Sequence, residues 1–263
     1  MNRREFSTGL IGGALAGLAP ELAFAAKQPK RVLVLAYAAG YRHASIPTAA
    51  ATVARLGTET GLWTVTETLT TPEQVAAGIT AARLAGADLV FFANTTGNLP
   101  ITEAGKQEFY AWIQQGGGWA GVHSAADTFH GDERYLNLVG AEFKTHGPQV
   151  KVSVHCDDRK HPATRDLPAQ FEVFDEIYEF KNWSREKVHM LLSMDKHPQT
   201  GKPGDYAVAM CKRVGKGRAF YTSLGHRKDM YANPLYLKHL TGGLKWALGL
   251  AKGSAKPGNP QAK

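Results

Sequence analysis

Three histidines of this chain follow segments whose composition is typical of buried strands. They are His43, a few residues after the apolar run 30–38; His123, at the end of the run 119–123; and His226, after the run 218–224. Ligands of open parallel sheets bind beyond the carboxyl ends of the strands, so we predict that the three imidazoles converge at one edge of a sheet. Neutral imidazole binds divalent metals, and imidazole also moves protons near neutral pH. The pattern indicates acid–base or metal chemistry.

His123 has the most informative position of the three. In Gly121-Val122-His123-Ser124-Ala125 a predicted strand turns directly into the next segment, and such a junction presents its central residue at the top of the sheet. A junction built for acyl transfer carries Ser or Cys at that place, because the side chain must attack a carbonyl. Histidine there favours proton transfer or metal binding, while a structural histidine, hydrogen-bonded at the end of a strand, is the alternative. An amidase or peptidase that uses Ser124 is the least favoured interpretation.

The segment 171–180 offers a carboxylate. If it forms one strand, alternation places Phe174, Glu176 and Tyr178 on one face and Asp175 on the other. A carboxylate among inward aromatic rings is costly unless it is paired. We therefore predict that Glu176 is the functional carboxylate, although a pair of exposed acids is an equally good interpretation of the same pattern.

Further side chains are candidates around these groups. Asp127 lies one turn after His123 and is predicted to orient that imidazole or to bind a hydroxyl group. The candidates for substrate binding are Tyr41, Arg42, His146 and Tyr178.

His43, His123 and His226, with Glu176 as a carboxylate, can supply the ligands of one divalent ion such as Zn²⁺ or Mn²⁺. No ligand spacing of the H-E-x-x-H kind supports a metal, so a metal-free cluster that moves protons stays open beside it. No nucleotide cofactor is expected. Cys156 and Cys211 are too few for a disulfide framework or a cysteine-rich zinc site, and they are either a single pair or two buried thiols.

The elements that must position these side chains alternate regularly in the first half of the chain. Strands are predicted over 30–38, 63–69, 87–94 and 119–123, and helices over 45–61, 72–85 and 102–115. This rhythm predicts an α/β fold with a doubly wound, mainly parallel sheet. After about residue 140, shorter segments predict an antiparallel extension, namely 149–155, 171–180, 188–194, 206–213 and 218–224, with a hairpin signal at 215–217. A helix over 236–248 closes the fold, and the small, polar, basic tail 251–263 is predicted to be disordered.

Composition limits the class of protein. The 263 residues are 43% hydrophobic and 21% charged. These values are ordinary for a globular chain, and the length suits one large domain. No apolar run reaches the eighteen or so residues of a membrane span. The net charge of +8 is scattered rather than grouped, so nucleic acid is not an expected partner. No particular oligomeric state is predicted.

Residues 1–25 have the pattern of an export signal. Arg3-Arg4 precedes a weakly apolar stretch that ends in Ala23-Phe24-Ala25, which is the pattern of a twin-arginine signal with cleavage after Ala25. We predict a periplasmic or secreted protein.

Several of these motifs resemble those of the ThuA-like (trehalose utilisation) family. The resemblance covers about residues 31–250 of a domain predicted over 26–250, and the motifs that carry it are 40–43, 116–125, 174–178, 215–218 and 221–226. It implies a flavodoxin-like sheet similar to that of the class I glutamine amidotransferases. In those enzymes the junction after the strand carries a nucleophilic Cys served by a late His. Here His123 has the place of the Cys and His226 that of the late His, so the nucleophile for amidotransfer is missing.

The resemblance also implies a role in disaccharide catabolism, on 3-keto sugars made by a partner sugar 3-dehydrogenase. A carbonyl at C3 acidifies the proton at C2, so a base and an electrophile can expel the substituent at C1. His123 or Glu176 would take the proton, and a metal or an imidazolium would stabilise the enediolate. The catalytic candidates are His123, Glu176, His226 and Asp127. The leading interpretation is an exported lyase, hydrolase or isomerase, and the alternative is a non-catalytic carbohydrate-binding protein.

Overall fold

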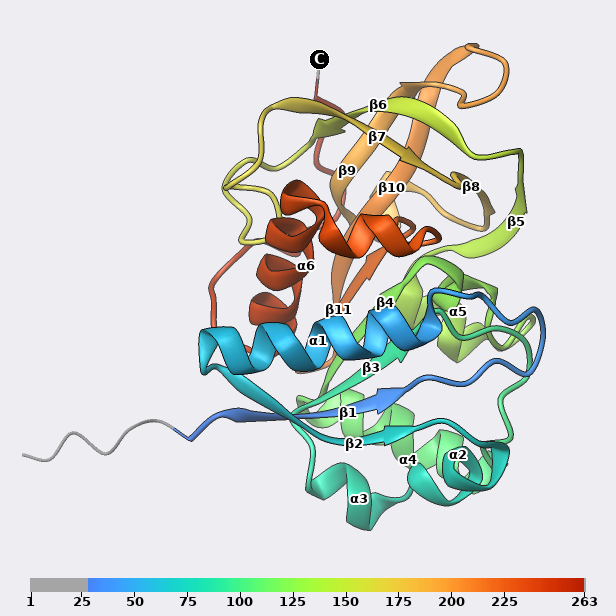
Figure 1. Ribbon diagram of the computed structural model, residues 1–263, viewed down its shortest axis with the longest axis vertical. Coiled ribbons are helices and arrows are strands. Elements are labelled where there is room, and N and C mark those ends of the chain that lie inside the picture. The colour runs from blue at the N-terminus through green and yellow to red at the C-terminus, as the bar shows by residue number, and fades with distance from the viewer. Residues whose placement is uncertain (1–27, 263) are drawn as a thin grey trace, which may run out of the picture.

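The fold is built on one large sheet. The computed structural model describes residues 28–262 (Figure 1), so the predicted export signal lies outside the described residues. The strands are β1 (Lys30–Leu35), β2 (Trp63–Leu69), β3 (Leu89–Ala93), β4 (Gly118–Val122), β5 (Glu142–His146), β6 (Val150–Cys156), β7 (Gln170–Asp175), β8 (Tyr178–Lys181), β9 (His189–Lys196), β10 (Pro203–Val214) and β11 (Gly217–Thr222). The helices are α1 (Ile46–Thr60), α2 (Pro72–Gly78), α3 (Ala81–Ala85), α4 (Glu103–Gln115), α5 (Glu133–Val139) and α6 (Pro234–Ala247), with 3₁₀ turns η1 (His123–Asp127), η2 (Arg185–Lys187) and η3 (Lys228–Ala232).

Nine strands form the sheet in the order β2-β1-β3-β4-β11-β10-β9-β6-β7. The strands β2, β1, β3, β4 and β11 pair in parallel, which is the 2-1-3-4-5 order of flavodoxin-like folds. The strands β10, β9, β6 and β7 continue the sheet with antiparallel pairing and occupy the upper part of Figure 1. The predicted fold class is confirmed.

Helices cover both faces of the parallel half. On one face α1 and α6 pack against alternate residues of β1 and β3, such as Val34 and Phe91. On the other face α2 to α5 pack against the intervening residues, such as Leu35 and Phe92. Burial on both faces explains why these strands are continuous apolar runs. In Figure 1, α1 crosses in front of the parallel strands.

Two predicted elements are divided in the structure. The helix predicted over 72–85 is divided into α2 and α3. Thr80 lies between them, and its side chain caps α3 by accepting a hydrogen bond from the backbone N–H of Arg83. The strand predicted over 171–180 is β7 and β8, which belong to different sheets. In β7 the buried residues are Phe171, Val173 and Asp175, so Asp175 faces inward at the end of the strand, while Phe174 is 46% exposed. The predicted alternation of faces is wrong at this point.

The polar tail differs from the predicted disorder. Residues 251–262 form no helix or strand, but the Asn259 side chain accepts a hydrogen bond from the Met190 N–H at 2.8 Å and donates one to the Met190 carbonyl at 2.9 Å. The strand β6 pairs with β9 only at Leu192 and Ser193. The Asn259 side chain thus supplies hydrogen-bond partners to the backbone of Met190, which β6 does not reach. Hydrophobic patterning does not detect such an amide contact.

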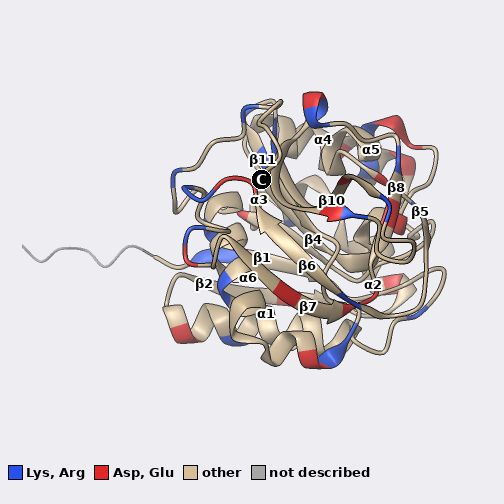
Figure 2. Ribbon diagram, turned by 90° about the horizontal axis from the view of Figure 1, so that it is seen from above, with Lys and Arg blue, Asp and Glu red and all other residues tan. Residues whose placement is uncertain are grey.

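The remaining surface and core features fit a globular chain. Lys and Arg are interspersed with Asp and Glu around the outside of the fold (Figure 2). Among the helices of residues 28–262, none combines the length and hydrophobicity needed to cross a bilayer. Cys156 and Cys211 are both buried free thiols.

The Asn259 contacts predict a stability effect for Asn259→Ala. The change leaves the buried backbone of Met190 without partners, so we expect a loss of about 2 kcal/mol in the free energy of unfolding. Urea unfolding measures it. Asn137→Ala, at an exposed position of α5, is the control. Its effect on stability should stay below about 0.5 kcal/mol. Equal effects of the two changes would show that the Asn259 contacts contribute no stability.

Candidate active site

His123 is presented by a tight junction between β4 and η1. The residues of β4 are all buried, and His123 itself has φ of 46°, in the left-handed region. Gly121 is needed for this turn, because a Cβ there would lie 2.6 Å from the Trp119 ring and 2.7 Å from Cβ of Ala125. The hydroxyl of Tyr221 donates a hydrogen bond to the His123 carbonyl at 2.6 Å, which fixes the strained backbone.

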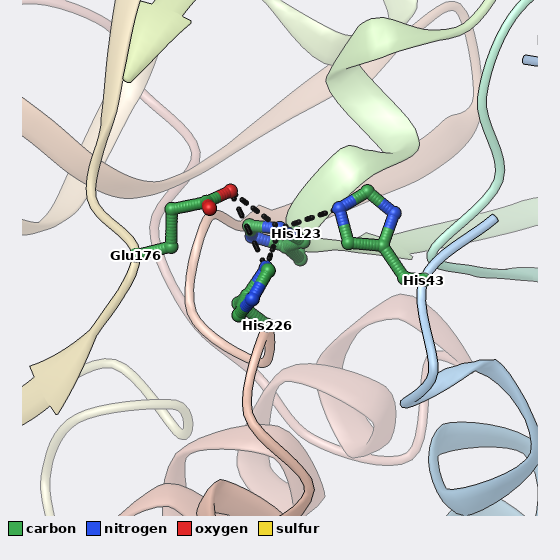
Figure 3. A group of neighbouring side chains, drawn as sticks. All are labelled: His43, His123, Glu176 and His226. Carbon is green, nitrogen blue, oxygen red and sulfur yellow. Dashed lines mark hydrogen bonds and ion pairs between the residues drawn. The ribbon is translucent and has the colours of Figure 1, made fainter. Parts of the chain in front are cut away.

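The three predicted histidines and Glu176 lie together (Figure 3). The Nε2 atom of His123 is 3.2 Å from Nε2 of His43 and 3.2 Å from Nδ1 of His226. The Oε1 atom of Glu176 is 3.4 Å from the same Nε2 of His123 and 3.3 Å from Nδ1 of His226. The three imidazoles follow β1, β4 and β11, whereas Glu176 comes from the link between β7 and β8. We call these four side chains the His–Glu cluster.

The hydrogen bond on the far side of His123 determines where its lone pair points. Nδ1 of His123 is 2.9 Å from the backbone carbonyl of Ser223. A carbonyl can only accept, so Nδ1 carries the proton. In the neutral ring Nε2 then presents a lone pair to the centre of the cluster. The hydroxyl of Tyr178 lies 3.1 Å from this nitrogen and donates to it.

Burial and mutual contact set the charges of the cluster. Burial, with repulsion from His123 and His226, lowers the pKa of His43 to about 3, so this imidazole is neutral at physiological pH. Burial raises the pKa of Glu176, but the hydrogen bond donated by His226 and the positive charge of that imidazole outweigh burial and hold the pKa below its usual range. The hydrogen bond to Glu176 raises the pKa of His226. Glu176 and His226 thus form an ion pair beside two further imidazoles.

The donor set of the cluster fits a divalent metal. Donor atoms about 2.0–2.1 Å from a tetrahedral zinc ion lie about 3.3 Å from one another. All four donor atoms lie within 4.8 Å of one another, and the contacts of His123 and Glu176 within the cluster measure 3.2, 3.3 and 3.4 Å. A second contact that orients a histidine ligand, such as the carbonyl bound by His123, is usual at metal sites. Among the described residues, Nδ1 of buried His43 has no hydrogen-bond partner.

The predicted substrate-binding residues surround the cluster. His146 pairs with Tyr178 across β5 and β8, and its Nδ1 is 3.3 Å from Oε2 of Glu176. The Tyr41 ring is 71% exposed and meets His43 edge-on, with 4.8 Å between ring centroids. Arg42 is exposed on the same loop. Tyr41, Arg42 and His146 are exposed, whereas Tyr178 and His123 are buried.

Asp127 does not take the predicted place beside His123. Its carboxylate pairs with His130, whose other ring nitrogen is 2.7 Å from Glu142. The backbone carbonyl of Ser223, which no side-chain pattern can identify, orients His123 instead.

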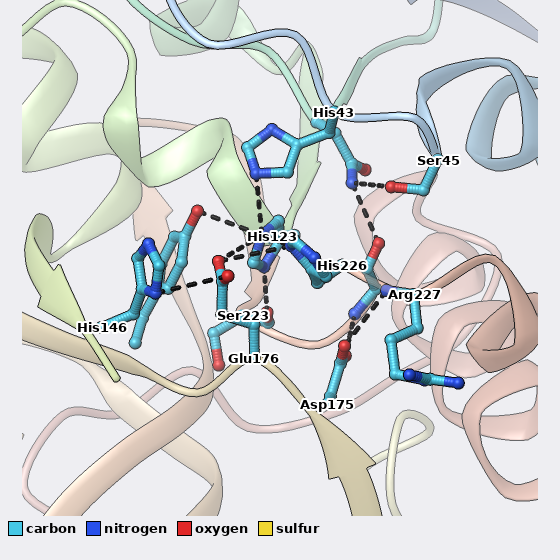
Figure 4. Close-up of polar contacts among 12 residues, drawn as sticks. His43, Ser45, His123, His146, Asp175, Glu176, Ser223, His226 and Arg227 are labelled. Atoms are coloured by element: carbon cyan, nitrogen blue, oxygen red, sulfur yellow. Dashed lines mark hydrogen bonds and ion pairs between the residues drawn. The ribbon is translucent and has the colours of Figure 1, made fainter. Parts of the chain in front are cut away.

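Two buried polar residues, Asp175 and Asn94, hold the loops of the site (Figure 4). Neither residue was predicted from the sequence. The Asp175 carboxylate accepts hydrogen bonds from the N–H groups of Gly225 and Arg227. The Asn94 amide donates to Ser45 and to the Gly225 carbonyl. Asn94 is a polar residue at the end of a predicted apolar strand. This position is the one feature of the sequence that could have identified Asn94 as a residue of the site. A single strand over 171–180 places Asp175 on the face opposite the aromatic rings, so the sequence pattern gives no sign that its carboxylate is buried.

Fold and site together define a flavodoxin-like α/β protein with a histidine–carboxylate cluster at the carboxyl ends of its parallel strands. The sequence matches the family ThuA, described as trehalose utilisation, over residues 31–247, and the chain belongs to this family. No curated protein matches it.

Solved structures share the fold. A ThuA-like protein from Bacteroides uniformis ATCC 8492 is 23% identical with a TM-score of 0.67, covering 84% of this chain and 93% of its own. One from Parabacteroides merdae ATCC 43184 is 17% identical with a TM-score of 0.71, covering 84% and 90%. A β-galactosidase from Bacillus circulans sp. alkalophilus is 11% identical with a TM-score of 0.53, covering 88% of this chain and 32% of its own. These identities establish similarity of fold alone.

The lowered pKa of His43 predicts a pH dependence of stability. Between about pH 6.5 and about pH 3, the unfolded chain binds a proton at His43 that the folded protein does not, so stability falls as pH falls. His43→Gln should make the slope of unfolding free energy against pH shallower by about 1.4 kcal/mol per unit within this window.

Urea unfolding at a series of pH values measures that slope. Ser45→Ala, a change in the same loop that does not titrate, should lower stability equally at every pH. Identical slopes for wild type and His43→Gln would contradict the burial of a neutral His43.

Proposed function

We propose that this protein is an exported sugar-catabolic enzyme that acts on oxidised (3-keto) disaccharides or glycosides by acid–base chemistry with a divalent metal such as Zn²⁺ or Mn²⁺. Membership of the trehalose utilisation family supports the substrate class. The observation that carries the proposal is the convergence of three imidazoles and one ionised carboxylate within 4.8 Å. A purely structural histidine does not need three other ionisable groups around its free nitrogen.

The four side chains divide into two roles. His43, His123 and His226 would hold the metal, since catalytic sites keep three protein ligands and one open position. A bound divalent ion supplies positive charge that stabilises an enediolate. Glu176, whose Oε1 lies 3.3 Å from Nδ1 of His226, would stay ionised beside the positive charge of the metal, and it would accept the proton from the carbon next to the keto group.

Tyr178 supplies a hydrogen-bond donor at the same place. Burial raises the pKa of its hydroxyl well above the usual value, so the group stays protonated throughout the physiological range. It lies 3.1 Å from Nε2 of His123, at the centre of the cluster, where negative charge develops on the substrate oxygen. An oriented, protonated hydroxyl favours that charge.

The exposed side chains of Tyr41, Arg42 and His146 suit a sugar. The open Tyr41 ring offers an apolar face for stacking, and Arg42 and His146 offer hydrogen-bond donors to hydroxyl groups. We further propose that a sugar 3-dehydrogenase makes the keto sugar, because the C2 proton is acidic only after C3 is oxidised. The predicted twin-arginine signal would place the reaction in the periplasm or outside the cell.

Turnover of 3-ketotrehalose tests this function, followed by product analysis and metal analysis of the purified protein. Glu176→Gln keeps the shape of the side chain but removes the base, so kcat should fall by about 10²- to 10⁴-fold. A chelator should abolish turnover, and Zn²⁺ or Mn²⁺ should restore it. His130→Gln, which changes an exposed histidine outside the cluster, is the control and should keep kcat.

Two outcomes would contradict the proposal. Tight binding of the keto sugar without product would favour a carbohydrate-binding protein. Turnover that survives chelation but is lost in His226→Gln would assign the positive charge to the His226 imidazolium instead of a metal.

A further inference from the structure

We infer that Asp175 is a positioning residue for His226, and that it acts with Asn94 by holding the backbone of Gly225 at its N–H and at its carbonyl. This inference rests on the proposed use of His226 as a metal ligand. Asp175 does not belong to the His–Glu cluster, and the proposed reaction does not use it.

The carboxylate of Asp175 binds the backbone on both sides of His226. It accepts hydrogen bonds from Gly225 N at 2.7 Å and from Arg227 N at 3.1 Å. The residue is fully buried at the inner end of β7, where an unpaired carboxylate would be costly. Its neighbour Glu176 contacts the side chain of the same histidine, so one dipeptide binds both the backbone around His226 and its ring.

The carbonyl of Gly225 is held by Asn94. The Asn94 amide donates to the Gly225 carbonyl at 2.9 Å and to the Ser45 hydroxyl at 2.9 Å. The Tyr231 hydroxyl is 3.1 Å from the same carbonyl and 3.0 Å from Oδ1 of Asn94. Ser45 lies two residues after His43, so Asn94 joins the loops that carry two of the three imidazoles.

The backbone at Gly225 leaves no room for a side chain. Its φ is 114°, and a Cβ would lie 2.6 Å from the Tyr231 hydroxyl and 2.7 Å from the Tyr236 hydroxyl. Functional constellations tolerate displacements of only about 0.5 Å. Because buried side chains bind Gly225 at both its N–H and its carbonyl, the backbone keeps His226 within that tolerance.

Titration with Co²⁺ alone tests the inference without any measurement of turnover. In Asp175→Asn the NH₂ group cannot accept, so at least one of the two backbone N–H groups loses its partner. We expect Co²⁺ to bind about 10- to 100-fold more weakly, as for other changes in groups that orient metal ligands. The visible spectrum of the Co²⁺ complex should also change, because His226 is displaced from the ion.

Asp88→Asn is the matched control. The Asp88 carboxylate also accepts a backbone N–H, from Arg31 at 2.8 Å, but at the opposite end of the parallel strands. This variant should lose stability while it keeps the wild-type Co²⁺ affinity and spectrum. Urea unfolding shows that the compared variants are folded.

If Asp175→Asn does not fold, Asn94→Gly decides the question. Asn94 has φ of 51°. Glycine adopts such a conformation readily, so the change removes the amide contacts without backbone strain. A folded variant of either kind with wild-type Co²⁺ affinity and spectrum would overturn the inference, as would a wild-type protein that binds no Co²⁺. A protein that binds Co²⁺ as expected but does not convert 3-ketotrehalose would overturn the proposed function and leave the role of Asp175 intact.

Discussion

The hydrogen bond from Nδ1 of His123 to the Ser223 carbonyl is the interaction on which the site depends. It fixes the tautomer of a fully buried imidazole and aims the Nε2 lone pair at the place where His43, His226 and Glu176 meet. The parallel pairing of β4 with β11, in which Val122 lies opposite Thr222, brings the carbonyl to the ring. The central sheet therefore sets the chemistry of the histidine as well as its position.

The site lies where the two halves of the sheet meet. The strand β11 is the last parallel strand and pairs with β10 in the antiparallel half, and it leads into the loop of His226. The antiparallel half supplies Asp175 and Glu176 through β7 and its continuation. Neither half has a complete His–Glu cluster, so the antiparallel extension is part of the functional unit.

The fold and the three histidines were predictable because both depend on local signals. Continuous apolar runs mark strands that helices cover on both faces, and the residues after such strands gather at one edge. The alternation that predicts Glu176 differs from the structure, since Glu176 lies between two strands rather than on one face of a single strand. Its burial, nevertheless, is real.

The features that the sequence did not predict depend on long-range polar contacts. The partner of Asp127 is His130 rather than His123, and the partner of His123 is a backbone carbonyl a hundred residues away. Asn94 and Asp175 matter because of the peptide groups they bind, and the tail is held through Asn259. Hydrophobic periodicity carries no information about which amide a carboxylate or carboxamide will meet.

X-ray absorption by the Zn²⁺-loaded protein shows whether His43, His123 and His226 bind one ion, because it counts the imidazoles around the ion without requiring a substrate. We expect three imidazole nitrogens at about 2.0–2.1 Å with the remaining positions filled by oxygen. An ion surrounded by oxygen atoms alone would contradict this expectation, and would leave the His–Glu cluster as a group of hydrogen-bonded side chains with no metal function.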